Sequence, residues 1–296
     1  MRAAVLFLAF VAAAAMPAPV AAQSSEQTIY ASVIGKKDRK PVEGLSVTDF
    51  VVKEDGTSRE VLRAGRTADP IDLAIIVDTS TAIQPHQNDL RKALTAFVTR
   101  MAGDHAANVA ILSMADRPTI LSDYTTSVAE LTRAVQRIFA QPNSGTVFQD
   151  AVSDTVKGLL KHDNPRRAIV VITTEGTDFS NVPYERTLEA LRNSGAGFHA
   201  LVLTDRTGSA TRDQNARERA IVVDRGTTST GGVRDDLLSS MELSDALTRL
   251  ADELAQQYKV VYGRPGSLMP PKKLDVSVKR PDADTRATLV RPKSGA

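Results

Sequence analysis

Hard oxygen donors follow a run of apolar residues in the stretch LAIIVDTSTA, residues 73–82. Asp78 comes directly after the apolar run and Ser80 follows two residues later, so both side chains are expected on one side of a tight loop. Carboxylate and hydroxyl oxygens suit Mg²⁺, Mn²⁺ or Ca²⁺ rather than zinc or copper. We therefore interpret the stretch as a buried strand that ends in a ligand or cation site.

Two further segments offer oxygen donors of the same kind. NSGTVFQDA (143–151) carries Thr146 at the start of an expected helix, and TTEGTDFS (173–180) carries Glu175 just beyond an expected buried strand. In doubly wound sheets, ligands bind at the carboxyl ends of the strands, where the strand order reverses. We therefore expect both segments to converge on the loop of Asp78.

The elements that must position these donors follow from four near-continuous apolar runs. Such runs are typical of parallel strands that are covered on both faces. They are residues 71–78, 108–114, 167–174 and 198–204. Between and after them, apolar residues recur at helical spacing in sets that begin at Leu90, Val128, Phe148 and Leu243. This alternation predicts an α/β fold with a doubly wound, mostly parallel sheet and right-handed crossovers.

The two ends of the mature chain look different from its middle. Short β-branched runs separated by turn residues predict β structure in residues 23–70 and 258–296. A terminal hairpin is rarely stable alone, so we expect these segments to form one small β unit into which the α/β domain, residues 71–257, is inserted. Within that domain, residues 205–219 are polar and loop-like, whereas AIVVD (220–224) is compatible with a strand or a helix.

The first 22 residues have the layout of a cleaved secretory signal. A basic start precedes an apolar run over residues 5–16, and small residues lead to the expected cleavage point before Gln23. The apolar run is short for a bilayer span, which disfavours the alternative of an uncleaved anchor. We expect an exported protein, in a bacterial periplasm or outside the cell, with no membrane span after cleavage.

Composition excludes several classes of function. The chain has no cysteine, so it can form no disulfide, thiolate zinc site or cysteine nucleophile. Its 37 Lys and Arg residues are nearly balanced by 35 Asp and Glu residues, which predicts no basic surface for nucleic acid. The histidines show no metal-binding spacing, and Ser80 lies outside any G-x-S-x-G motif, so a serine hydrolase is not expected.

The order of these motifs resembles that of a von Willebrand factor type A domain. An apolar strand with D-T-S, a Gly-Thr at a helix start that ends in Asp-Ala, and the run VVITTEG occur in the order of that family. The flanks KKDRKPVEGLSVTDFVVKEDG and LADELAQQYKVVYG are similar to those of bacterial VWFA-related secreted proteins. The resemblance covers residues 28–291 and implies a Rossmann-like fold.

The resemblance also implies a metal-ion-dependent adhesion site, in which a bound divalent cation accepts a carboxylate from a protein partner. Asp78 and Ser80 then take the first two ligand positions, Thr146 takes the threonine position, and Glu175 stands where the family has aspartate. The second serine of the family's loop falls on Ala82, which has no oxygen, and Glu175 is one methylene longer than aspartate. We therefore expect a degenerate site for Mg²⁺, Mn²⁺ or Ca²⁺.

Three functions are compatible with this site. The leading interpretation is an exported, non-enzymatic protein-binding module whose cation-dependent binding is abolished by Asp78→Ala while the fold survives. The alternative is a metal-free structural scaffold in an envelope assembly, which Ala82 and Glu175 favour. A metal-assisted hydrolase is the third, but it lacks a recognisable general base. Asp178 fits either an outer-sphere partner of the cation or an exposed loop residue.

Overall fold

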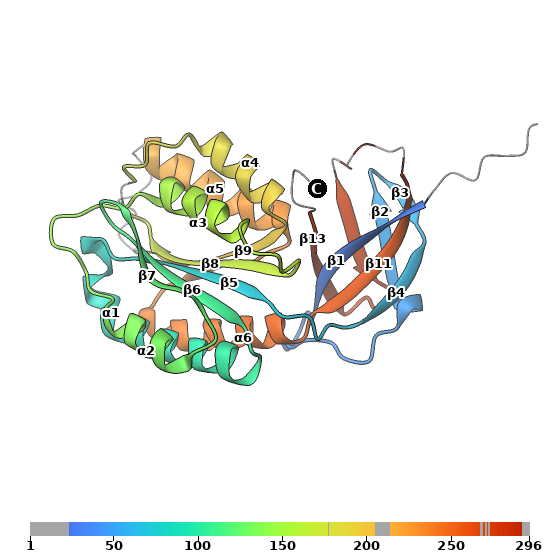
Figure 1. The fold of residues 1–296 in the computed structure, drawn as a ribbon, viewed down its shortest axis with the longest axis horizontal. Helices are drawn as coiled ribbons and strands as arrows, with labels where there is room; N and C mark the ends of the chain where they lie inside the picture. The colour runs from blue at the N-terminus through green and yellow to red at the C-terminus, as the bar shows by residue number, and fades with distance from the viewer. Residues whose placement is uncertain are drawn as a thin grey trace, which may run out of the picture.

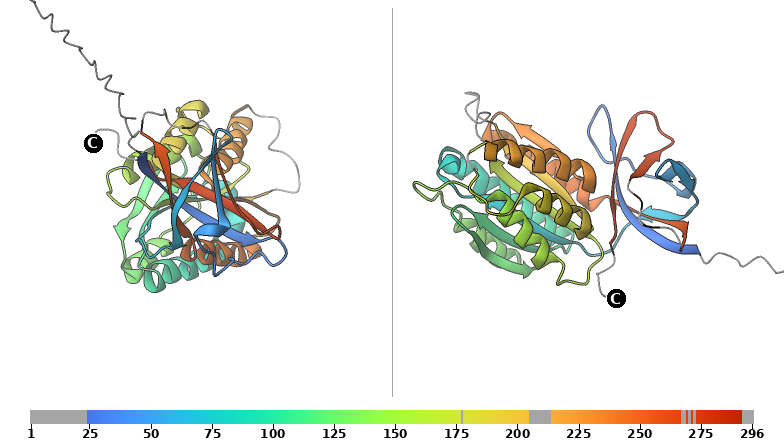
Figure 2. Two further views of the ribbon diagram at one scale, coloured as in Figure 1. Left: turned by 90° about the vertical axis from the view of Figure 1, so that its right-hand side faces the viewer. Right: turned by 90° about the horizontal axis from the view of Figure 1, so that it is seen from above.

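The computed structural model describes residues 24–176, 178–204, 214–266, 269, 271 and 273–291. The predicted signal, residues 1–22, lies outside the described residues. Figure 1 shows an α/β domain beside a smaller β unit, and the turned views in Figure 2 place that unit at one end of the domain. Within the described part of the chain, no helix has the length and apolar character that a bilayer span requires.

A six-stranded sheet forms the middle layer of the α/β domain, in the order β10-β9-β8-β5-β6-β7. Its strands are β5 (Asp72–Asp78), β6 (Asn108–Met114), β7 (Pro118–Thr125), β8 (Arg167–Thr174), β9 (Ala196–Leu203) and β10 (Arg234–Leu237). Neighbouring strands are parallel except for β6 and β7, which are antiparallel. Because β6 and β8 lie on opposite sides of β5, the strand order reverses between β5 and β8, where such sheets bind ligands.

Helices cover both faces of this sheet, which explains why its central strands are apolar throughout. Leu73, Ile75 and Val77 of β5 pack with α1, α2 and α6, whereas Ala74 and Ile76 pack with α3, α4 and α5 (Figure 1). The helices are α1 (Gln87–Val98), α2 (Val128–Gln136), α3 (Phe148–Leu159), α4 (Tyr184–Ser194), α5 (Gln214–Thr230) and α6 (Leu243–Ala255). Short helical segments are η1 (Val47–Asp49), η2 (Thr81–His86), η3 (Thr99–Asp104) and η5 (Ser240–Glu242).

The β unit is built from both ends of the described chain. One antiparallel sheet has the order β13-β1-β11-β4, and a three-stranded sheet has the order β12-β2-β3. The strands are β1 (Ser24–Gly35), β2 (Phe50–Glu54), β3 (Thr57–Arg59), β4 (Val61–Arg66), β11 (Tyr258–Pro265), β12 (Leu274–Val278) and β13 (Ala283–Leu289). The predicted fold class is therefore confirmed, including a β unit that the N- and C-terminal strands form together.

Three elements differ from the expectations drawn from sequence. Strands β7 and β10 were not expected, because β7 is an edge strand without a buried face and β10 has only four residues. The AIVVD segment lies inside helix α5, which settles its assignment. Residues 214–219, expected as part of a polar loop, form the first turns of that helix, while residues 205–213 lie outside the described residues.

The α/β domain and the β unit meet through a close backbone contact after α5. Gly231 ends that helix with φ +76°, and a Cβ atom at this position would lie 2.2 Å from the carbonyl oxygen of Ala287 in β13. Real Cβ atoms do not approach a carbonyl so closely, so only glycine fits here. The side chain of Thr288 donates a hydrogen bond of 2.8 Å to the carbonyl of Thr230 and fixes the same contact.

Gly231→Ala is therefore expected to lower the free energy of unfolding by about 3 kcal/mol or more, because β13 must move away from the new methyl group. Gly56→Ala is the matched control. Gly56 has φ +82° but nothing within 4 Å of an added Cβ, so that variant should lose only about 1–2 kcal/mol from backbone strain. Urea unfolding of both variants measures the difference, and equal losses would contradict the proposed contact.

His199 in β9 makes the stability of the fold dependent on pH. The side chain is 1% exposed, and burial lowers its pKa to about 4, against smaller opposing effects of Glu253 and Asp235. In the unfolded chain histidine has a pKa of about 6.5. The unfolded state therefore takes up the proton first, so the stability from His199 is fully present above about pH 6.5 and falls as the pH drops toward 4.

Between pH 7 and pH 4, the His199 contribution should reduce the free energy of unfolding by up to about 3 kcal/mol. His199→Gln should remove that part of the slope in urea titrations across this pH range. His105→Gln should not, because His105 is exposed in the same domain. An unchanged slope in His199→Gln would show that this imidazole is not the group responsible.

Candidate functional site

Asp78 ties the carboxyl ends of β5 and β8 together. Its carboxylate is fully buried, and Oδ1 accepts a hydrogen bond of 2.8 Å from the backbone N–H of Ser80. Oδ2 accepts from the Thr174 backbone N–H at 3.1 Å, the Thr174 hydroxyl at 2.9 Å and the Thr173 hydroxyl at 3.3 Å. Both oxygens of Asp78 are thus already engaged by donors of the protein itself.

Thr146 lies where the loop before α3 meets the loop after β8. Its backbone forms a parallel bridge with Asp178, and its carbonyl accepts a hydrogen bond of 2.8 Å from the N–H of Phe179. The loop before α3 also contacts the segment after Asp78, because the N–H of Thr81 donates to the carbonyl of Ser144 at 3.2 Å. The Thr146 hydroxyl is buried and has no hydrogen-bond partner among the described residues. The three predicted loops therefore converge at one edge of the sheet.

Asp178 is a buried member of this edge rather than an exposed loop residue. Its Oδ1 accepts hydrogen bonds from the backbone N–H of Phe148 at 3.0 Å and from the N–H and hydroxyl of Ser180 at 3.0 and 2.7 Å. Its Oδ2 is buried without a partner in the described part of the chain. Burial raises the pKa of Asp178 above its ordinary value, although these three donors oppose the shift.

Glu175 lies at the outer side of the same edge. Its side chain is half-buried on the loop that follows β8. The next residue, Gly176, lies close to Ala82, since a Cβ atom at that glycine would be 3.7 Å from the Ala82 methyl group. The two positions at which this chain departs from the family pattern, Ala82 and Glu175, therefore lie near each other in space.

Arg219 of α5 is the residue that the sequence pattern did not reveal. Its side chain is only 4% exposed, and its Nη1 has no hydrogen-bond partner among the described residues. Burial lowers the pKa of Arg219, whereas the charges of Asp78, Asp178 and Glu175 raise it. An arginine from a fourth segment thus lies within electrostatic range of all three carboxylates. Its spacing from the buried Val222, Val223, Gly226 and Thr230 places it on the inner face of α5.

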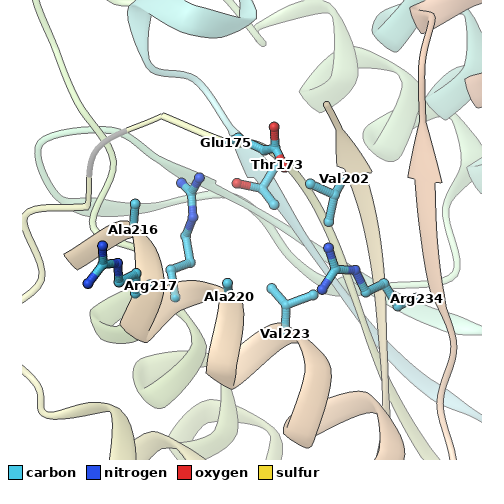
Figure 3. A pocket seen from close by; sticks show the side chains of 9 residues that line it. Thr173, Glu175, Val202, Ala216, Arg217, Ala220, Val223 and Arg234 are labelled. Atoms are coloured by element: carbon cyan, nitrogen blue, oxygen red, sulfur yellow. The ribbon is translucent and has the colours of Figure 1, made fainter. Parts of the chain in front are cut away.

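A cavity of about 280 Å³ opens beside these residues. Figure 3 shows Glu175 and Thr173 on one side of it and the α5 residues Ala216, Ala220 and Val223 on the other. The remaining lining residues are Val202, Arg217, Arg219 and Arg234. With three arginines and one glutamate, the lining is basic and suits an anionic group that carries a short apolar stem.

The residues present do not match the metal site that the resemblance implies. Both oxygens of Asp78 accept protein donors, Ala82 offers no ligand atom, and Arg219 already brings a positive charge to the carboxylates. No group of three or more His, Cys, Asp or Glu side chains in the described ranges is arranged to hold a metal ion. Binding of Mg²⁺, Mn²⁺ or Ca²⁺ by Asp78, Ser80, Thr146 and Glu175 stays a prediction, and no chemical step is derived from it.

Comparisons with known proteins agree on the domain. Residues 73–177 match the profile of the von Willebrand factor type A domain, which confirms the resemblance. Proximal thread matrix protein 1 from the mussel byssus has a similar fold, with a TM-score of 0.51 and 14% identity over 68% of this chain and 49% of that protein. This chain thus spans about half the length of the mussel protein. No curated protein sequence matches the chain.

Two further solved structures are similar at a lower level. A von Willebrand factor type A protein from Catenulispora acidiphila gives a TM-score of 0.49 and 12% identity over 90% of this chain and 72% of that one. The mussel protein has also been solved with a zinc-occupied MIDAS motif, with a TM-score of 0.49 and 14% identity over 68% of this chain and 49% of that one. The zinc is a property of the mussel protein.

Removing the carboxylate of Asp78 should destabilise the whole edge, contrary to the expectation that the fold survives this change. Asp78→Ala leaves the Ser80 N–H and the N–H and hydroxyl of Thr174 without their acceptor, whereas the Thr173 hydroxyl can still donate to the Thr174 carbonyl. The change also removes one counter-charge of Arg219. We expect a loss of about 3–5 kcal/mol in the free energy of unfolding. Thr146→Val removes a buried hydroxyl that has no partner, so its effect should stay within about 1 kcal/mol. Urea unfolding of both variants tests this, and a loss as large for Thr146→Val as for Asp78→Ala would contradict the site as described.

Proposed function

This chain carries a von Willebrand factor type A domain, and we propose that it is an exported, non-enzymatic module that binds a protein partner at the carboxyl edge of its six-stranded sheet. The residues of this edge come from the ends of β5 and β8, the start of α3 and the start of α5. The β unit joins the amino end of β5 (Figure 1), so it leaves the carboxyl edge open to a partner.

The observation that carries this proposal is the gathering of exposed apolar side chains around the same edge. Four of the seven large apolar side chains that are exposed in the described part are Phe139, Phe179, Leu238 and Met241. Phe179 follows the end of β8, and Leu238 and Met241 follow the end of β10. Phe139 is two residues before Gln141, whose N–H donates to the carbonyl of Thr79 just after β5.

A basic cavity and exposed apolar side chains at the same edge of a sheet are the composition expected of a protein-binding surface. The cavity would accept an anionic group of the partner, and the four apolar side chains, here called the rim, would add apolar contact area. Export is part of the proposal and is supported by the signal-like residues 1–22. The domain family matched by residues 73–177 supports an interaction module rather than a catalytic one.

A metal-free structural scaffold is the second candidate function. The observation that favours it is the complete engagement of Asp78 by protein donors, which makes this edge a rigid part of the fold. A metal-assisted hydrolase has less support, because a carboxylate that already accepts four hydrogen bonds is poorly placed to take a proton from water.

Site-specific crosslinking separates the module from the scaffold. A photoreactive phenylalanine analogue at Phe179 or Leu238 should give a discrete adduct with one protein in cells that export the chain. The same analogue at Lys161, which is exposed near the amino end of β8, should give none. Adducts from neither rim position, or the same adduct from all three positions, would contradict binding at the carboxyl edge.

A further inference from the structure

A buried guanidinium group lies within electrostatic range of three carboxylates at the edge that we propose for binding. Arginine does not lose its proton in proteins, so Arg219 carries its charge although it is 4% exposed. A buried charge is tolerated only where opposite charges and hydrogen-bond partners compensate it. The compensating carboxylates are Asp78, Asp178 and Glu175, which come from two other segments of the chain.

These carboxylates lie at the edge where the family resemblance places a divalent cation. Asp78 and Glu175 are two of the predicted ligands, and Asp178 is bridged to a third, Thr146. A second positive ion placed at the same carboxylates would be repelled by Arg219 in a region of low dielectric constant. The Arg219 Nη1 donor and the acceptors Thr146 Oγ1 and Asp178 Oδ2 are all buried without a partner in the described residues. The donor and the two acceptors are not hydrogen-bonded to one another, so Arg219 acts on these carboxylates through its charge.

We propose that the guanidinium of Arg219 takes the role that a divalent cation has in a metal-ion-dependent adhesion site. Its charge compensates the carboxylates of two loops and attracts a carboxylate from a protein partner. The part of this proposal that concerns the partner rests on the proposed function, whereas the part that concerns the internal charge does not.

The cavity identifies the chemical class of the group that would bind. Arg217, Arg219 and Arg234 line it. Arg234 already pairs with Asp236 at 2.9 Å, whereas the Arg219 Nη1 has no hydrogen-bond partner among the described residues, and guanidinium groups bind carboxylates through paired hydrogen bonds. Val202 and Val223 provide an apolar wall for the methylene groups of an aspartate or glutamate side chain. Glu175 on the opposite wall disfavours a doubly charged group such as phosphate. We therefore assign the cavity to an acidic side chain of a protein partner, bound without a metal ion.

The role of the Arg219 charge is tested by measuring the thermal midpoint of unfolding of wild type and Arg219 variants in increasing concentrations of Mn²⁺. In wild type, the thermal midpoint should stay constant up to about 10 mM MnCl₂, a concentration above the dissociation constants of weak oxygen-ligand sites. Arg219→Met removes the positive charge that acts on the three carboxylates, so its midpoint should rise by about 5 °C over the same range. Arg219→Lys keeps the charge and should behave like wild type.

Arg225→Met is the matched control, because Arg225 is an exposed arginine of the same helix. It should show no response to Mn²⁺. The proposal is overturned if wild type responds as strongly as Arg219→Met, or if folded Arg219→Met, verified by circular dichroism, gains no response. If Arg219→Met does not fold, the proposal is tested by measuring Mn²⁺ binding to wild type by electron paramagnetic resonance. One bound ion per chain contradicts the proposal, and none supports it.

Binding of the partner without a metal ion is tested by a separate measurement. This measurement distinguishes a failure of the inference from a failure of the proposed function. Adducts from Phe179 should persist when the crosslinking is repeated with excess chelator, because no metal ion is needed. Loss of these adducts with chelator would overturn the inference and leave the binding module standing. Absence of adducts under all conditions would instead refute the proposed function, while the Mn²⁺ response of Arg219→Met would still report on the internal charge.

Discussion

Two buried charges of opposite sign, Asp78 and Arg219, constrain the architecture of this edge. A carboxylate and a guanidinium are stable in a protein interior only when opposite charges and hydrogen-bond partners compensate them. Four donors from the ends of β5 and β8 bond to Asp78, and the charges of carboxylates from two segments act on Arg219. These interactions favour a single arrangement of the loops after β5 and β8 and of the start of α5.

The rest of the fold keeps this edge accessible. The strand order reverses between β5 and β8, so the chain leaves β5 toward α1 on one face of the sheet and leaves β8 toward α4 on the other. The β unit contacts the opposite end of the domain, where Gly231 and Ala287 approach each other and His199 is buried. The contact between the two units and the proposed binding edge thus lie at opposite ends of the sheet.

The sequence predicted the elements whose signal is strong over many residues. The apolar runs of β5, β6, β8 and β9 are long and continuous because helices cover both faces of the sheet, and the periodic helices follow from the same cause. Strands β7 and β10 escaped notice, since an edge strand or a strand of four residues carries little pattern. Arg219 could not be inferred, because a single charged residue in a polar stretch ordinarily points to solvent, and only its spacing from Val222 and Val223 indicates the inner face.

The central claim is that Arg219, rather than a divalent ion, supplies the positive charge at this edge. Diffraction from crystals grown with Mn²⁺, recorded at the manganese absorption edge, tests it most directly. We expect no anomalous peak between Asp78, Thr146 and Glu175, with the Arg219 guanidinium ordered beside the carboxylates. A strong peak within bonding distance of the Ser80 and Thr146 hydroxyls, with Arg219 turned away, would contradict the account.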